Sequence, residues 1–255
     1  MRTFLGESTT FLSNLMKKTL PKPYTSANLA KKKANQIIVK LPDRLRWTKK
    51  QQEFLRIAQN SDTKVMFVKG PAGVSKTFIS VYCSLIALQE GKVSDIIYIR
   101  SVIESASKGL GFLPGEAGDK LAPYLAPFED KLKEFLTSTQ IKFLKDSKII
   151  SGQPVNYLRG SHLAGKYILV DESQNYTRDE LKTIITRVGD HSKIIFMGDP
   201  EQSDLPAGKS GFSSYYNAFE YAEHPNIPCF EFTRDDIVRS KLLKSILAII
   251  DSIED

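Results

Sequence analysis

The chain has 255 residues, of which 41% are hydrophobic and 25% are charged, a composition typical of a globular protein with one large domain, alone or with an appendage. No apolar run approaches the roughly 18 residues that a helix needs to cross a bilayer, so we expect no membrane partner. The two cysteines, Cys83 and Cys229, lie far apart beside apolar or aromatic residues, which argues against a disulfide framework or a cysteine metal site and favours a cytoplasmic protein.

The positive charge is concentrated at the start of the chain. The formal net charge is +7, and residues 1–40 hold eight basic residues against one acid, Glu7, so the rest is neutral. We predict a flexible basic arm over residues 1–40 and a folded domain over residues 41–255. The arm could bind nucleic-acid phosphates through counterion release or could be a solubilising tail, and both readings stay open. Its basic residues are Arg2, Lys17, Lys18, Lys22, Lys31, Lys32, Lys33 and Lys40.

From residue 45 onward, apolar strand-like segments alternate with helical segments. A helix is predicted over residues 46–60, after an N-cap at Thr48. A buried strand over residues 64–70 runs into a glycine-rich loop, and an apolar helix over residues 77–91 follows it, ending at Gly91. The next apolar segment, DIIYIR, predicts a strand over residues 95–100.

The second half of the chain continues this alternation. Residues 119–146 look helical, with a break expected at Pro123 and Pro127 because proline removes a helical hydrogen bond. The remaining predictions are strands over 166–172, 193–199 and 228–232, a helix over 177–189, and a final amphipathic helix over 236–253.

Strands that alternate with helices predict an α/β fold with a mostly parallel sheet and helices on both faces. In such sheets, ligands bind beyond the carboxyl ends of the strands. Gly70, Asp171 and Asp199 each fall where a predicted strand ends. We therefore expect these three residues to lie on one rim of the sheet.

The glycine-rich loop, KGPAGVSKTFIS over residues 69–80, nearly matches the phosphate-loop pattern, with Ser75 in place of the second glycine. Backbone N–H groups of such a turn and the following helix N-terminus form an anion cradle. Lys76 would neutralise the β and γ phosphates, and the Thr77 hydroxyl would ligate Mg²⁺. Gly70 and Gly73 can supply positive φ, and a small serine suits a capping position. We expect the loop to work, although alone it is weak evidence.

Two further motifs strengthen this reading. In YILVDESQN, over residues 167–175, Asp171 would present a carboxylate to the Mg²⁺ shell, and Glu172 could deprotonate the attacking water. The alternative is a strand-end turn with solvated acids. In FMGDPEQSDLP, over residues 196–206, Gln202 could contact the γ-phosphate or the water. The alternative there is an ordinary turn of Gly, Asp and Pro.

Seven motifs in this order resemble those of the PhoH family of P-loop ATPases, over residues 45–250. The DES-Q and GDP-Q motifs are also similar to motifs II and III of superfamily-one helicases. Ser75 departs from the family pattern, which puts turnover in more doubt than binding. The motifs are GPAGVSKT, GLGFLPGE (109–116), PYLAPFED (123–130), YLRG (157–160), ILVDESQN (168–175), GDPEQSDLP (198–206) and DDIVRS (235–240).

The resemblance implies a RecA-like core, ATP hydrolysis with Mg²⁺, and a link to RNA. It implies that Asp171 is the metal-shell acid, Glu172 the catalytic base and Gln202 the γ-phosphate sensor. Lys76 acts from within the phosphate loop. The loop residues that the resemblance covers are Gly70, Pro71, Ala72, Gly73, Val74, Ser75, Lys76 and Thr77.

Three further residues have open alternatives. Gln51 could read the adenine edge, or it could be a surface glutamine. Arg239 could be an arginine finger that reaches a neighbour's γ-phosphate, or it could form a surface salt bridge. Arg100 is a second candidate for phosphate or nucleic-acid contact. Superfamily-one helicases hold ATP between two RecA-like domains and this chain has room for one, so we expect a homo-oligomer, a hexameric ring.

The leading hypothesis is a Mg²⁺-dependent ATPase coupled to RNA or single-stranded nucleic acid. The first alternative is an ATP-gated nucleic-acid-binding module with little turnover because of Ser75. The second is a small-molecule phosphotransferase, since P-loop kinases share the phosphate cradle. Four aromatic residues could stack on bases, but core packing is the favoured reading for them. They are Tyr124, Phe128, Tyr215 and Tyr216.

Overall fold

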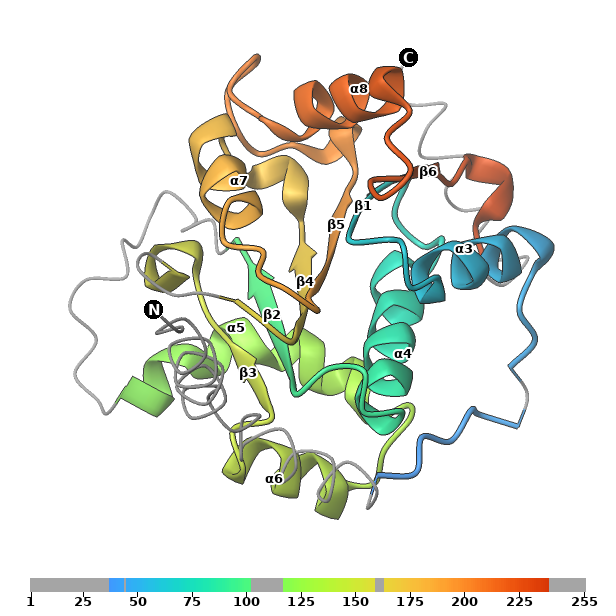
Figure 1. Ribbon diagram of the computed structural model, residues 1–255, viewed down its shortest axis with the longest axis vertical. Helices are drawn as coiled ribbons and strands as arrows, with labels where there is room; N and C mark the ends of the chain where they lie inside the picture. Colours follow the sequence, from blue (N-terminus) through green and yellow to red (C-terminus); the bar gives the residue numbers. More distant parts are fainter. Residues whose placement is uncertain (1–36, 44, 102–116, 159–162, 239–255) are drawn as a thin grey trace, which may run out of the picture.

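The computed structural model describes residues 37–43, 45–101, 117–158 and 163–238, which form a layered α/β fold (Figure 1). Its centre is a six-stranded sheet in the order β3-β2-β4-β5-β1-β6, and all neighbouring strands are parallel. The strands are β1 (Val65–Lys69), β2 (Asp95–Arg100), β3 (Ile150–Gly152), β4 (Lys166–Asp171), β5 (Lys193–Gly198) and β6 (Cys229–Glu231).

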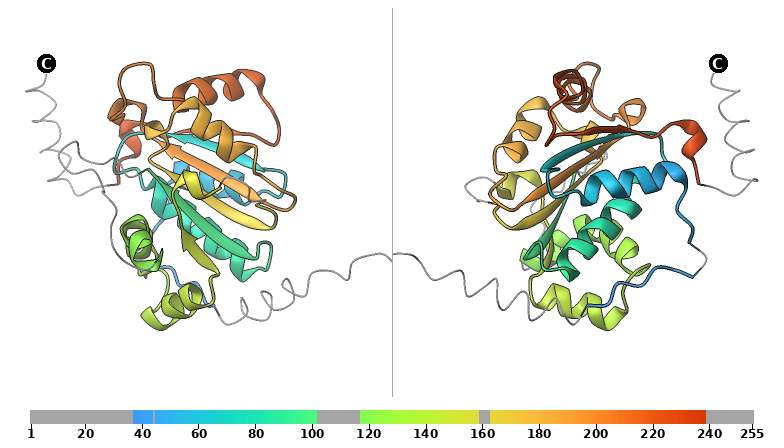
Figure 2. Two further views of the ribbon diagram at one scale, coloured as in Figure 1. Left: turned by 90° about the vertical axis from the view of Figure 1, so that its left-hand side faces the viewer. Right: turned by 45° about the vertical axis from the view of Figure 1, so that its right-hand side comes forward.

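Both faces of the sheet are apolar and covered by helices. Alternate residues of a strand point to opposite sides, and in these strands the residues on both sides are apolar. Along β1, Met66 and Val68 belong to one buried cluster, and Val65 and Phe67 belong to another. The first cluster packs against α3 (Lys49–Gln59), α4 (Lys76–Gln89), α5 (Ala117–Leu132) and α6 (Ser138–Asp146). The second packs against α7 (Arg178–Ile185) and α8 (Phe212–Ala222). Figure 2 shows helices on both faces.

Short 3-10 helices follow several strands and lead into the loops. They are η1 (Val155–Leu158), η2 (Ser173–Asn175), η3 (Pro200–Gln202) and η4 (Arg234–Asp236). Two of them, η2 and η3, come directly after β4 and β5, which is where the acidic motifs leave the sheet. The sheet, its parallel pairing and its two helical layers confirm the predicted RecA-like P-loop NTPase fold.

The strand order brings three strand ends together. After β1 the chain crosses to β2 and β3, and then returns through β4 and β5. As a result β5 lies between β4, which ends at Asp171, and β1, which leads into the loop. The amide of Gly70 donates to the carbonyl of Gly198 at 3.2 Å. The prediction that Gly70, Asp171 and Asp199 share one rim is therefore confirmed.

The helix α5 corrects one prediction, because it runs without a break through Pro123 and Pro127. The helix ends at Leu132 instead, and α6 begins after the N-cap Thr137. The prolines are four residues apart, so the amide that Pro127 lacks is the one that would bond the carbonyl of Pro123. Phe128 and Leu132 are fully buried, and this tertiary packing overrides the local preference of proline.

Several boundaries also differ from the predicted ones. The sequence did not predict β3 or α8, and most of the predicted helix over residues 236–253 lies outside the described residues. The predicted arm extends too far, because Ile37 is buried in the core and the Val39 amide donates to Oε1 of Gln89 at 2.9 Å. Residues 37–40 thus belong to the folded unit. Among the described helices, none has the length and apolarity needed to span a bilayer.

Candidate functional site

The loop between β1 and α4 has a backbone that requires glycine at two of its positions. Gly70 and Gly73 have φ angles of 157° and 90°, so the predicted positive φ is confirmed. A Cβ on Gly70 would lie 2.7 Å from the Cβ of Phe232, which leaves no room for a side chain. Val74 is fully buried in the core. It anchors the loop and does not line the cavity in front of it.

Ser75 adopts the left-handed conformation, with φ of 71° and ψ of 26°. A residue with a Cβ costs roughly 1–2 kcal/mol there, which is the physical reason why phosphate loops carry glycine at this position. The predicted capping by the serine hydroxyl is wrong, because Ser75 is the N-cap of α4 but its side chain makes no capping hydrogen bond. The helix nevertheless starts at Lys76, and the loop keeps its course.

A cavity of about 430 Å³ opens in front of the loop. It joins the loop, the end of β4 and the end of β5, so the three predicted motifs surround one space. Its lining consists of Ala72, Gly73, Ser75, Lys76, Thr77, Phe78, Lys131, Asp171, Glu172, Met197, Gly198, Asp199, Gln202 and Val238.

The Lys76 ammonium points back into its own loop. It donates to the carbonyl of Gly70 and to that of Pro71 at 2.9 Å. Burial lowers its pKa below 10.5, although the nearby carboxylates of Asp199, Asp171 and Glu172 act in the opposite direction. A partly buried cation that faces carbonyl oxygens is suited to exchanging them for the oxygens of a phosphate chain.

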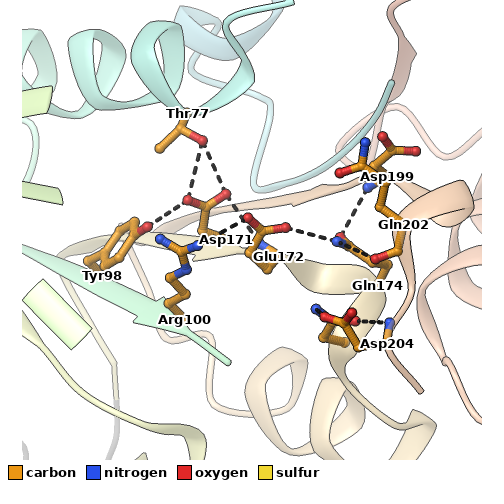
Figure 3. Close-up of polar contacts among 10 residues, drawn as sticks. Thr77, Tyr98, Arg100, Asp171, Glu172, Gln174, Asp199, Gln202 and Asp204 are labelled. Atoms are coloured by element: carbon orange, nitrogen blue, oxygen red, sulfur yellow. Dashed lines mark hydrogen bonds and ion pairs between the residues drawn. The ribbon is translucent and has the colours of Figure 1, made fainter. Parts of the chain in front are cut away.

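Asp171 is held by hydrogen bonds from three sides (Figure 3). The Thr77 hydroxyl lies 3.1 and 3.2 Å from its two carboxylate oxygens. The Tyr98 hydroxyl donates to Oδ2 at 2.6 Å, and the Glu172 amide donates to Oδ1 at 3.2 Å. Burial raises the pKa of Asp171, and the hydrogen bond from Tyr98 lowers it. The phosphate loop and the acid at the end of β4 are therefore in direct contact.

Glu172 has a left-handed backbone conformation, with φ of 51° and ψ of 44°. Each of its carboxylate oxygens has a donor: Arg100 lies 3.3 Å from Oε1, and Gln174 lies 2.8 Å from Oε2. Non-glycine residues in this conformation are uncommon and often functional. Both acids line the cavity.

Gln174 connects the two acidic motifs. Besides its bond to Glu172, its side-chain carbonyl accepts the Asp199 amide at 3.0 Å, and its amide nitrogen lies 3.4 Å from the Gln202 carbonyl. A second link runs from Asn175 to Asp204, with two hydrogen bonds of 2.9 and 2.8 Å. The turns after β4 and β5 are thus fixed relative to each other (Figure 3).

Gln202 and Asp199 lie beside this bridge. Both line the cavity, and the Asp199 carboxylate accepts from the Glu201 amide at 3.2 Å. Burial raises the pKa of Asp199, and the Lys76 ammonium acts in the opposite direction. Gln202 is well placed to contact a bound ligand, and its role as a γ-phosphate sensor stays a prediction.

The donor set at Thr77 and Asp171 fits Mg²⁺. A hydroxyl oxygen beside a carboxylate at the edge of a polar cavity supplies the hard oxygen ligands that this ion prefers. The described part of the chain has no cluster of three or more His, Cys, Asp or Glu side chains that could hold a metal unaided. Mg²⁺ is commonly bound by one or two carboxylates together with substrate phosphates.

Two predicted site residues, Gln51 and Arg239, are not among the described residues that line the cavity. Gln51 does not line the cavity; it is buried, and its Oε1 accepts the Thr48 amide at 3.0 Å as part of a capping box. The predicted N-cap at Thr48 is confirmed. The alternative that Gln51 is a surface glutamine is wrong. That Gln51 contacts the adenine edge stays a prediction. Arg239 lies outside the described residues, although Val238 before it lines the cavity and its amide donates to Gly73 at 3.2 Å.

The aromatic candidates for base stacking pack internally. Phe128 is fully buried and stacks on Tyr98, with centroids 4.9 Å apart. Tyr216 is also buried, and Tyr215 stacks on Phe219. The core-packing reading of Phe128 and Tyr216 is therefore confirmed. The side chain of Tyr124 lies outside what the structure describes.

Three residues of the site were missed by sequence reasoning: Tyr98, Lys131 and Gln174. Tyr98 carries the only hydroxyl in the apolar strand DIIYIR, and a polar group at a buried position is a usable signal. Gln174 lies within the DESQN motif, but two of its partners, Asp199 and Gln202, come from the turn after β5. Lys131 reaches the cavity from α5, and no local pattern distinguishes it from neighbouring surface lysines.

Known proteins share sequence similarity with most of this chain. A family model described as PhoH-like protein matches residues 45–251. The chain is 36% identical over 202 residues to a PhoH-like protein of Bacillus subtilis (strain 168), which covers 79% of this chain and 62% of that protein. It is 36% identical over 184 residues to a PhoH-like protein of Mycobacterium tuberculosis (strain ATCC 25618 / H37Rv), covering 72% and 51% respectively. The chain therefore spans about half to three fifths of these relatives.

Among solved structures, the large terminase from a thermophilic bacteriophage is similar with a TM-score of 0.49 and 14% identity. The match covers 80% of this chain and 50% of the terminase chain.

Proposed function

The chain belongs to the PhoH-like protein family, and from this premise we propose that it binds ATP with Mg²⁺ in the loop cavity and hydrolyses the terminal phosphate. One observation carries the proposal. The Thr77 hydroxyl of the loop lies 3.1 Å from the Asp171 carboxylate of β4, beside Lys76, Glu172 and Gln202 on the same cavity. The Lys76 ammonium, the two metal ligands, the Glu172 carboxylate and the Gln202 carboxamide thus line one cavity. Phosphoryl transfer to water requires such a set of groups around the phosphate.

Each residue has a distinct task in this proposal. The loop amides and Lys76 bind and neutralise the phosphates. Thr77 and Asp171 would hold Mg²⁺, which would supply neutralisation of charge on the phosphate oxygens. Glu172 orients the attacking water and accepts its proton. Gln202 contacts the γ-phosphate, and Gln174 transmits any movement of Gln202 to Glu172, because it touches both.

Lys131 joins this set as a second cation. It lines the cavity from α5, together with the carboxylates of Asp171, Glu172 and Asp199. An ATP molecule brings several negative charges into that space, and a second ammonium offsets part of them in a partly dehydrated site. We assign Lys131 to phosphate binding together with Lys76.

The proposal includes coupling to RNA or single-stranded nucleic acid. The concentration of basic residues in the N-terminal arm supports it, since Lys and Arg clusters bind phosphates by counterion release. It also includes a homo-oligomer, a hexameric ring, in which Arg239 reaches the γ-phosphate of a neighbour. That part rests on the single sheet of the described residues, which offers one side of an ATP site. If the protein sediments as a monomer in the presence of ATP, Mg²⁺ and RNA and still hydrolyses ATP at its full rate, this part of the proposal is contradicted.

The experiment is steady-state phosphate release with and without a panel of RNAs and single-stranded DNAs. We expect Mg²⁺-dependent release that nucleic acid stimulates. Lys76→Ala should lose ATP binding, whereas Glu172→Gln should bind ATP without releasing phosphate. Release that needs neither Mg²⁺ nor these side chains would contradict the proposal.

A second candidate function is an ATP-gated nucleic-acid-binding module with little turnover. The left-handed Ser75 favours it, because a strained loop can bind phosphate in a ground state and still fit the transition state poorly. ATP binding that changes nucleic-acid affinity, together with a flat phosphate trace in all conditions, would favour this module over the ATPase.

A further inference from the structure

Tyr98 is a polar residue at a position that packing alone would fill with an apolar one. It lies in the middle of β2, with Gly152 of β3 and Leu169 of β4 as its strand partners, and it is fully buried. A phenylalanine at this position would fill the same apolar space. A buried hydroxyl is unfavourable unless it has a hydrogen-bond partner, so the hydroxyl needs an explanation of its own.

The partner of this hydroxyl is the carboxylate that the proposed function assigns to Mg²⁺. Tyr98 donates to Oδ2 of Asp171 at 2.6 Å, a short charge-assisted bond. On its other side the ring stacks on Phe128 with centroids 4.9 Å apart and an interplanar angle of 5°. The ring is therefore fixed between α5 and the carboxylate, and it cannot turn without breaking one contact.

This arrangement gives a role to the motif PYLAPFED (123–130), which contains none of the proposed catalytic residues. Phe128 belongs to PYLAPFED, and Lys131 follows it by three residues on the same helix. Residues three apart lie on one face of a helix. One face of α5 thus seats the tyrosine ring and also brings a lysine to the cavity.

We propose that Tyr98 is a positioning residue that orients the Asp171 carboxylate for Mg²⁺ and thereby sets the affinity of the site for the metal. The inference rests on the proposed function. Hydrogen bonds from outer residues fix the orientation of ligating carboxylates, and their loss typically weakens metal affinity by about 10- to 100-fold. Without this hydroxyl, Asp171 keeps two of its described donors, the Thr77 hydroxyl and the Glu172 amide, and both of these residues line the cavity.

The test is Tyr98→Phe, which keeps the ring and its stack and removes one oxygen atom. The matched control is Tyr167→Phe on the adjacent strand β4, since the buried Tyr167 hydroxyl has no hydrogen-bond partner among the described residues. Mn²⁺ binding in the presence of ADP, followed by electron paramagnetic resonance, reports the metal without turnover. We expect Mn²⁺ affinity to fall about tenfold in Tyr98→Phe and to stay within twofold of wild type in Tyr167→Phe.

Phosphate release gives a second readout. Its half-saturating Mg²⁺ concentration should rise by the same factor in Tyr98→Phe, and turnover should recover at high Mg²⁺. In an Asp171→Asn background, Tyr98→Phe should cause no further loss of Mn²⁺ affinity. Phe128→Leu, which loosens the seat of the ring and keeps the hydroxyl, should shift metal affinity in the same direction by a smaller factor.

Equal Mn²⁺ affinity in wild type and Tyr98→Phe would overturn the inference while leaving the proposed function intact. An additive loss in the Asp171→Asn background would overturn it as well. If ADP does not promote Mn²⁺ binding to the wild-type protein at all, the proposed function itself fails, and the inference fails with it.

Discussion

Arg100 and Glu172 face each other at the carboxyl rim of the sheet, with Nη2 of Arg100 3.3 Å from Oε1 of Glu172. The strand register creates this pair, because Arg100 on β2 lies opposite Asp171 on β4 and Glu172 comes next. Arg100 does not line the loop cavity. Its contact is with the proposed base and not with the proposed phosphate site.

Arg100→Gln should therefore slow turnover without weakening ATP binding. We expect kcat to fall about tenfold, since a general base contributes roughly 10²–10⁴-fold and here loses only one of its two orienting donors. The KM for ATP should stay within twofold. Because both side chains are partly exposed, the pair adds little to stability. Arg178→Gln, whose guanidinium donates to Ser214 at 2.8 Å, is the control and should behave like wild type. A change in KM alone would contradict the assignment.

Ser75→Gly should relieve the left-handed strain in the loop. We expect the free energy of unfolding to rise by about 0.5–1 kcal/mol, which is the left-handed penalty less the greater freedom of glycine in the unfolded chain. Urea denaturation measures this effect. Turnover should rise several-fold, because the loop amides become free to follow the phosphates.

Lys148→Gly is the matched control for Ser75→Gly. Lys148 has φ of 55° and lies in the turn after α6, away from the cavity. It should gain similar stability with no change in turnover. Unchanged turnover in Ser75→Gly would show that the serine does not limit hydrolysis.

Lys131→Ala should weaken ATP binding by about tenfold, because a hydrogen bond to a charged group contributes about 1.5–3 kcal/mol. The measurement is the dissociation constant of a fluorescent ATP analogue at constant salt. The control is Lys133→Ala, an exposed lysine two residues away that pairs with Asp130 at 2.8 Å. Equal affinity for the two variants would remove Lys131 from the phosphate site.

Lys193 should make stability depend on pH at the opposite end of the sheet from the loop. Burial lowers its pKa from 10.5 to about 8, and its ammonium donates to the carbonyls of Ala58 and Asn60. Between pH 8 and 10.5 the unfolded chain binds more protons at this residue than the folded one, so stability rises with pH there. The unfolding free energy of wild type minus that of Lys193→Met should therefore rise over this window. A difference that does not change with pH would contradict this prediction.

Local patterns were sufficient to predict much of the architecture. Apolar runs of four residues predicted β1, β2, β4 and β5, because a strand buried on both faces needs a continuous apolar run. The glycine spacing predicted the loop, and strand-end acids predicted the rim. Pro123 and Pro127 show where this reasoning fails. Their local preference to break a helix is real, but the burial of Phe128 and Leu132 outweighs it.

The sequence by itself determined which residue types stand at the ends of the strands, since periodicity and turn chemistry are properties of neighbours along the chain. Only the tertiary structure decided which of them touch. Thr77 and Asp171 are 94 positions apart, and Tyr98 and Asp171 are 73 apart. Their contacts depend on strand order and register, which local periodicity does not encode. The same holds for the bond from the Asp199 amide to Gln174 and for the position of Lys131 at the cavity, because hydrogen bonds and charges act through space.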